Sequence, residues 1–121
     1  MKNEIEINGK MIPFYFGTKA LDDVCEDANL SLEQFYEMAS KGTRIGVVAK
    51  VLYYGLKSAA ENNSTDFKYK LNDAFLLIDQ DFSLVKRVNE VVNNQMQSIF
   101  NSETSEGNGN GLPRKKVAAS R

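Results

Sequence analysis

The strongest constraint on the fold lies near the start of the chain, where Asn8-Gly9 separates two stretches that alternate between polar and apolar residues, 4–7 and 11–16. Asn and Gly tolerate the positive φ angles of a two-residue type I′ turn, so this pattern predicts a β-hairpin. In the register that such a turn sets, Ile7 faces Lys10 and Ile5 faces Ile12. One face of the hairpin then carries the apolar side chains, which are Ile5, Ile7, Ile12, Phe14 and Phe16.

An isolated two-stranded hairpin is marginally stable in water, so its apolar face must pack against something else. The sequence leaves two partners open: the helices of the same chain, or the sheet of a neighbouring molecule. Pro13 has no N–H to donate, so we expect it on the outer edge of its strand.

Five stretches with helical periodicity follow the hairpin. We expect helices over about 18–28, from Ser31 to just before Gly42, over about 44–61, over 71–78, and from Asp81 or Ser83 to about Phe100. Thr18 is the expected cap of the first helix and Asn29 its stop. Ser31 and Gln34 have the spacing of a capping box before the second helix, and the third helix has the widest apolar surface. The expected fold class is mainly α (α+β): an N-terminal β-hairpin followed by about five helices in a single domain over residues 1–101.

The composition changes after residue 101, where Ser, Glu, Asn and Gly dominate. This part of the chain has too few apolar residues to offset the entropy of an ordered chain, so residues 102–121 are predicted to be a disordered tail. The tail contains the basic cluster Arg114-Lys115-Lys116, which is too short to hold nucleic acid firmly at physiological salt. We interpret the cluster either as a solvated segment or as one that binds a partner.

Charge and cysteine content limit the environment and the partners. The net charge is -1, with -3 on residues 1–100 and +2 on residues 101–121, so no nucleic-acid surface is expected. A single cysteine, Cys25, fits a reducing cytoplasm. The N-terminus has no signal-peptide pattern, and no apolar run reaches the roughly 20 residues of a spanning helix, so neither export nor membrane insertion is expected.

Reactive side chains are scarce in this sequence. Histidine, the commonest general base and transition-metal ligand, is absent. Cys25 lies on the apolar stripe of the first predicted helix beside Asp23 and Glu26, which favours a buried structural thiol over a nucleophile. We therefore expect no catalytic, cofactor-binding or metal-binding residues, and no enzymatic activity.

One acidic pattern resembles a calcium loop. Asp79, Asp81, Ser83 and Glu90 have the spacing of EF-hand ligands, but Leu84 stands where the loop requires glycine. Helix capping by the carboxylates is the favoured interpretation.

Two glycines lie inside the third predicted helix, Gly46 and Gly55. They do not have the spacing of a phosphate-binding loop. We expect them to let another helix pack closely.

Several short motifs follow one another in a particular order and end with an amphipathic helix. They are Ile5-Glu6-Ile7-Asn8-Gly9-Lys10, Pro13-Phe14-Tyr15-Phe16-Gly17, Ala20-Leu21, Leu30-Ser31-Leu32-Glu33, Leu52-Tyr53-Tyr54-Gly55-Leu56-Lys57 and Leu77-Ile78-Asp79. In their order and spacing, these motifs resemble the tail assembly chaperones of long-tailed bacteriophages. The resemblance covers about residues 4–100.

The resemblance implies a non-catalytic assembly factor in the cytoplasm of a bacterial host. Such a protein binds and solubilises the long tape measure protein, helps recruit tail tube protein subunits, self-associates, and is absent from the finished virion. A longer, frameshifted form often accompanies it. The alternative is a small helical adaptor or regulatory domain unrelated to phage, and a very long helical coding region immediately downstream would favour the chaperone.

Two apolar surfaces are candidates for binding a partner. The first lies on the last predicted helix, through Val88, Val92, Met96 and Ile99. The second is the aromatic pair Tyr53 and Tyr54. The alternative for both is that they complete the core of the domain itself.

Overall fold

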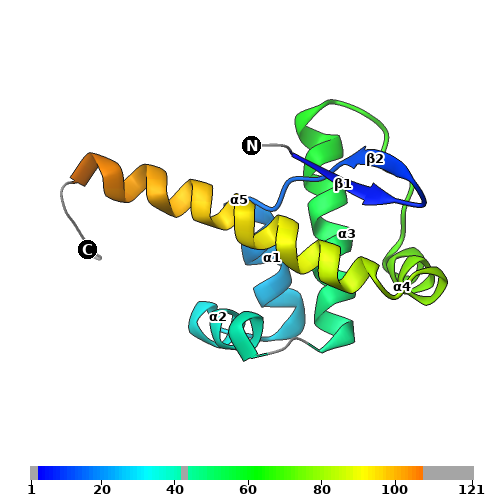
Figure 1. The fold of residues 1–121 in the computed structure, drawn as a ribbon, viewed down its shortest axis with the longest axis horizontal. Helices are drawn as coiled ribbons and strands as arrows, with labels where there is room; N and C mark the ends of the chain where they lie inside the picture. Colours follow the sequence, from blue (N-terminus) through cyan, green and yellow to red (C-terminus); the bar gives the residue numbers. More distant parts are fainter. Residues whose placement is uncertain (1–2, 42–43, 108–121) are drawn as a thin grey trace.

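The computed structural model describes residues 3–41 and 44–107 of the 121-residue chain. The predicted fold class is confirmed, because an antiparallel hairpin precedes five helices (Figure 1). The elements are β1 (Glu4–Ile7), β2 (Lys10–Pro13), α1 (Thr18–Ala28), α2 (Leu32–Lys41), α3 (Ile45–Asn62), α4 (Leu71–Gln80) and α5 (Leu84–Gly107).

The hairpin has the predicted turn and the predicted register. Asn8 and Gly9 have φ angles of 53° and 79°, the positive values that a type I′ turn requires. Ile5 pairs with Ile12 and Ile7 pairs with Lys10. Of the predicted apolar face, Ile12 is half-buried and the other four residues are fully buried.

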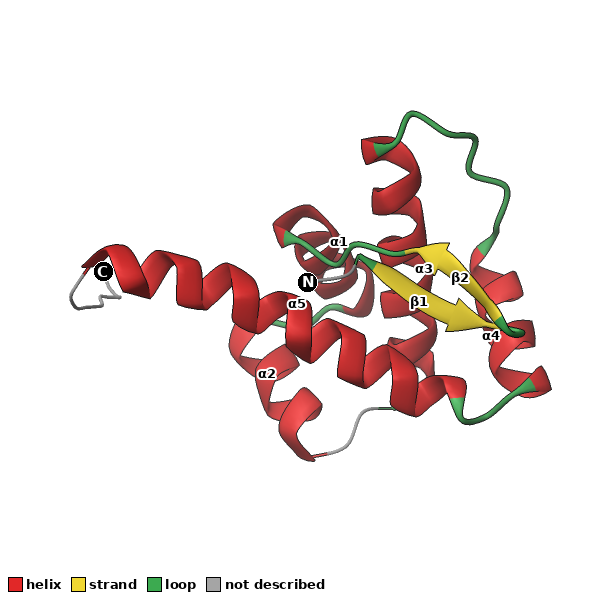
Figure 2. Ribbon diagram, turned by 45° about the horizontal axis from the view of Figure 1, so that its top comes forward, coloured by secondary structure: helices red, strands yellow, loops and turns green. Residues whose placement is uncertain are grey.

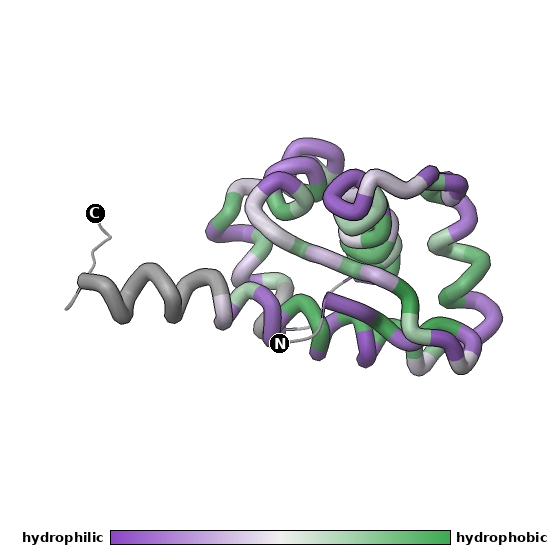
Figure 3. Tube along the Cα trace, turned by 90° about the horizontal axis from the view of Figure 1, so that it is seen from above, coloured by the Kyte–Doolittle hydropathy of each residue, from purple (hydrophilic) through white to green (hydrophobic). Residues whose placement is uncertain are grey.

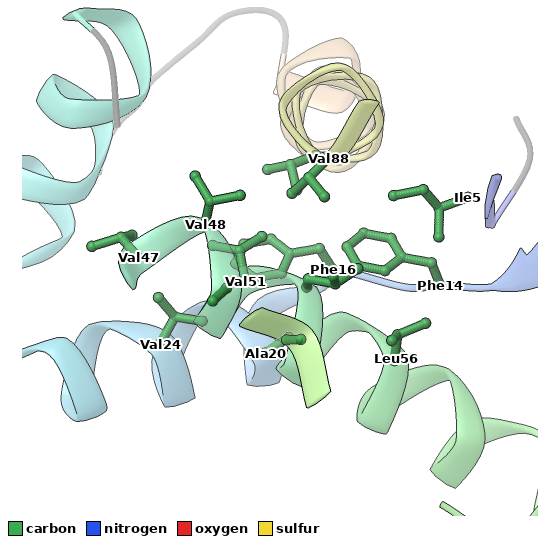
Figure 4. Close-up of a cluster of buried hydrophobic side chains, with 14 of the residues drawn as sticks. Ile5, Phe14, Phe16, Ala20, Val24, Val47, Val48, Val51, Leu56 and Val88 are labelled. Atoms are coloured by element: carbon green, nitrogen blue, oxygen red, sulfur yellow. The ribbon is translucent and has the colours of Figure 1, made fainter. Parts of the chain in front are cut away.

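The hairpin packs on helices of its own chain, which answers the question that the sequence left open. α5 lies along β1, and α3 lies along β2 (Figure 2). In the core, Val88 points from α5 toward Phe14 and Phe16, which follow β2 (Figure 4). The two sides of this core are about 70 residues apart in sequence, so it forms only when the last helix closes over the hairpin.

α3 is the central helix, as its wide apolar surface predicts. It contacts β2, α1, α4 and α5. Apolar residues predominate along this helix (Figure 3). Its fully buried side chains include Val48, Ala49 and Leu52.

The hairpin meets α3 at a glycine. The Tyr15 N–H donates a hydrogen bond of 3.0 Å to the carbonyl oxygen of Gly55. A Cβ atom at Gly55 would collide with the ring of Phe14. Gly55 therefore permits a close approach, but by the segment after β2 and not by another helix as predicted. The same prediction is wrong for Gly46, whose Cβ position is open.

The predicted stops and caps are mostly confirmed. Asn29 ends α1 in the left-handed conformation, with φ 58°. Ser31 and Gln34 form a reciprocal capping box before α2, with hydrogen bonds of 2.8 and 3.1 Å. The prediction for Thr18 is wrong: it is the first residue of α1, and Gly17 is the N-cap without a side-chain hydrogen bond.

α5 is longer than predicted. It continues to Gly107, seven residues beyond the expected end at Phe100, and its C-terminal half extends away from the body of the molecule (Figure 1). Residues 101–106 contain no glycine or proline, so no helix breaker occurs before Gly107. Residues 102–107 of the predicted disordered tail are therefore helical, and the rest, 108–121, lies outside the described residues.

Candidate interaction surfaces

The structure places the first predicted partner surface inside the core. Val88, Val92 and Met96 are 1%, 5% and 9% exposed, so they complete the core and are not accessible to a partner. This is the alternative that the sequence left open. The sequence predicts the helical stripe correctly, but its partners are the protein's own β1, α3 and α4. The side chain of Ile99 lies outside the described residues.

A buried amide on α5, which the sequence reasoning missed, holds this packing together. Gln95 is 1% exposed, and its Oε1 accepts a hydrogen bond of 2.6 Å from the Phe16 N–H. Its Nε2 donates one of 2.9 Å to the Phe14 carbonyl. In the part of the chain that the structure describes, this one side chain satisfies both backbone groups of the segment between β2 and α1. In the sequence, the only indication of this role is that Gln95, a polar residue, directly precedes Met96 of the apolar stripe.

The second predicted surface, Tyr53 and Tyr54, is half-buried and belongs to a longer row of aromatic rings. The ring centroids of Tyr54 and Tyr53 are 4.9 Å apart, those of Tyr53 and Phe67 are 5.3 Å apart, and those of Phe67 and Tyr69 are 5.9 Å apart. We call these four residues the aromatic row. It runs from α3 to the loop before α4. The sequence alone does not predict the contact between Tyr53 and Phe67 that joins these two parts.

One end of the aromatic row is tied to α1. The Tyr54 hydroxyl donates a hydrogen bond of 3.0 Å to the carboxylate of Asp27. Burial, and then the hydrogen bond and charge of Asp27, raise the pKa of Tyr54 to about 12. The Lys57 ammonium lies 5.9 Å from the centre of the Tyr54 ring. Tyr54 is therefore held against α1, at the opposite end of the row from Phe67 and Tyr69.

That other end lines a pocket of about 220 Å³, which we call the aromatic groove. Apolar side chains from β2, α3 and the loop before α4 form most of its wall, and Asp66 and Lys68 add opposite charges. The lining residues are Ile12, Pro13, Leu56, Ala60, Thr65, Asp66, Phe67, Lys68 and Tyr69. Its apolar wall and mixed polar edge resemble the centre and rim of a protein interface.

A second hollow of about 640 Å³ lies along α1 and the start of α2, and we call it the acidic groove. Its lining residues are Thr18, Leu21, Asp22, Cys25, Glu26, Leu30 and Leu32. Among these lining residues, Leu32 is a large apolar side chain that is 48% exposed.

Cys25 is half-buried in this groove, so the prediction of a buried thiol is only partly right. Burial, and then the charge of Asp22, raise the pKa of the Cys25 thiol. A raised pKa leaves less thiolate at neutral pH, which opposes a role as nucleophile.

The calcium-loop alternative fails on backbone geometry. Asp79 is in α4, and α5 begins at Leu84, so the residues that would form the second half of the loop are helical. The Asp81 carboxylate is already used: it accepts hydrogen bonds from the Ser83 N–H and hydroxyl and pairs with the Arg87 guanidinium at 2.7 Å. These contacts lower the pKa of Asp81 and fix the turn that leads into α5.

Comparisons of the chain with protein-family models, with curated proteins and with solved structures found no match. Within residues 3–41 and 44–107, no helix has the length and apolar character needed to cross a membrane.

Proposed function

We propose that this protein is a non-catalytic tail assembly chaperone of a long-tailed bacteriophage. It binds and solubilises the tape measure protein, helps recruit tail tube subunits and self-associates in the cytoplasm of the bacterial host. The motifs that resemble the family support this proposal because several of them meet at one structural junction. The hairpin, the segment after β2, and the stretch around Gly55 are all parts of the contact between β2 and α3.

The observation that carries the proposal is the aromatic groove. Val88, Val92 and Met96 are buried, whereas Tyr53 and Tyr54 of the second predicted surface are partly exposed. This pair continues through Phe67 to Tyr69, and these two rings line the aromatic groove. Aromatic side chains are large and rigid, and they supply much of the binding energy in protein interfaces. We therefore assign tape measure binding to the aromatic groove.

The size of the aromatic groove fits side chains of a helix better than a small molecule. Its volume of about 220 Å³ is below the usual range of small-molecule sites. Burying one Leu or Met contributes roughly 1.5–3 kcal/mol, which gives only a weak single contact. Many self-associated copies along one long helix would turn weak contacts into a stable coat.

The test is co-purification with a tape measure fragment made in the same cells. Phe67→Ala with Tyr69→Ala removes two rings of the groove, and we expect a loss of about 2 kcal/mol, or roughly thirtyfold in affinity. Both residues lie in the loop before α4, outside the buried core, so the circular dichroism should stay helical.

The matched control is Leu76→Ala, which removes an exposed apolar side chain of α4 that does not line the groove. It should leave co-purification unchanged. Full capture of the fragment by the folded groove variant would contradict the assignment to this surface. Failure of the unchanged protein to capture any tape measure fragment would contradict the proposed function itself.

A further inference from the structure

The acidic groove has an apolar floor that no described part of the chain covers. Leu21, Cys25 and Leu30 contribute to the hollow between α1 and the start of α2, and the half-exposed Leu32 stands at its edge. Two carboxylates, Asp22 and Glu26, also line it and are exposed. The groove therefore combines apolar area with negative charge, which defines the chemistry of a fitting ligand.

The negative charge of this groove is not neutralised from within the described structure. Among residues 3–41 and 44–107, Asp23 pairs with Lys19 and Asp27 pairs with Lys50, at 3.4 and 3.7 Å. No ion pair of the described residues involves Asp22 or Glu26. These two carboxylates are available to a basic partner.

The chain itself contains a segment with complementary chemistry. Residues 112–117 read Leu-Pro-Arg-Lys-Lys-Val, so two apolar side chains bracket three positive charges. Residues 108–121 carry four cationic side chains and no acidic one. Ten residue steps separate Gly107 from Val117, an extended reach of about 35 Å, comparable to the diameter of a small domain.

We propose that the acidic groove binds the segment 112–117 of this protein. Arg114, Lys115 and Lys116 lie against Asp22 and Glu26, and an apolar end of the segment covers the floor of the groove. This contact gives a role to the basic cluster, and it does not depend on the proposed chaperone function. Because the charges are near the surface, the contact weakens as salt rises.

Cys25 provides a built-in probe of this contact, because it is the only cysteine of the chain and lines the groove. The experiment measures the rate at which uncharged iodoacetamide modifies Cys25, as a function of pH, in the full chain. The comparison variant is the full chain with Arg114→Ser, Lys115→Ser and Lys116→Ser.

Two signatures are expected in the unchanged protein. The maximal rate of Cys25 modification at high pH is lower than in the Ser-substituted variant, because the bound segment covers the thiol. With an effective concentration on the order of 1 mM and a similar dissociation constant, the groove is covered about half of the time, which slows the reaction roughly twofold. The pH at which this rate reaches half of its maximum is also lower than in the Ser-substituted variant, because the bound cations favour the thiolate.

The controls separate this contact from general charge effects. Lys10→Ser with Lys86→Ser removes two exposed lysines that line neither groove and should leave both signatures intact. Asp22→Asn with Glu26→Gln should abolish the difference between the unchanged tail and the Ser-substituted tail, as should about 1 M salt, where the Debye length is about 3 Å.

A synthetic peptide of residues 108–121, added to the Ser-substituted protein, should restore protection of Cys25, and the same peptide with three serines should not. Protection of Cys25 that rises with protein concentration would support binding of the segment 112–117 to the acidic groove. It would show that the segment of one copy binds the groove of another. Equal rates and equal midpoints for both tails, with no protection by the peptide, would overturn the proposal.

Discussion

The sharpest stability prediction concerns Gln95, whose side chain joins α5 to the segment between β2 and α1. Its amide accepts from the Phe16 N–H at 2.6 Å and donates to the Phe14 carbonyl at 2.9 Å. Gln95→Met keeps a side chain of similar length but removes both hydrogen bonds. The hydrogen-bonding partners remain buried, since Phe14 and Phe16 are each 0% exposed.

The magnitude follows from the two backbone groups that lose their partner. A buried donor or acceptor left unsatisfied costs about 1–3 kcal/mol, so the two together cost roughly 2–6 kcal/mol. Because packing is largely kept, we expect a loss near 4 kcal/mol in the free energy of unfolding, or about 15 °C in Tm for a domain of this size. Such a loss is a large share of the total stability of a small domain, about 5–15 kcal/mol.

The assay is urea denaturation followed by circular dichroism, with the midpoint and the slope fitted separately. The matched control is Gln97→Met, the same change at an exposed position two residues further along α5, which should shift stability by less than about 0.5 kcal/mol. A second variant, Gln95→Glu, should be least stable at neutral pH and recover stability in acid, because only the protonated acid can donate to Phe14. A loss below about 1 kcal/mol for Gln95→Met would refute the reasoning.

Two further predictions test the junction at α3 and the tie to α1. Gly55→Ala forces a Cβ atom into the Phe14 ring and should lower stability by about 1–3 kcal/mol, whereas Gly46→Ala, at an open helical position, should raise it by up to about 1 kcal/mol; paired denaturation curves would check both. In an ultraviolet absorbance titration, Tyr54 should ionise near pH 12, and Asp27→Asn should lower that midpoint. Stability should fall from about pH 10 to 12, because the unfolded tyrosine loses its proton first; a flat profile would contradict this.

The proposed sites were only partly predictable from the sequence. The sequence indicates the helical stripe through Val88, Val92 and Met96, but an apolar stripe looks the same whether it packs in the protein's own core or against another molecule. The sequence also indicates the aromatic pair Tyr53 and Tyr54, but their contact with Phe67 depends on how the chain returns after α3. The acidic groove was not predictable from the sequence, because a hollow at these residues exists only in the observed arrangement of α1 and the start of α2.

The sequence by itself determined the elements whose causes are local. The turn at Asn8-Gly9 and the hairpin register depend on residues that are neighbours along the chain or directly across one turn. The same is true of the stop at Asn29 and the capping box of Ser31. Tertiary structure decided which apolar faces are covered, which polar side chain is buried, and where hollows remain. Gln95 reaches backbone groups about 80 residues away, and no local pattern encodes a contact that exists only after α5 closes over the hairpin.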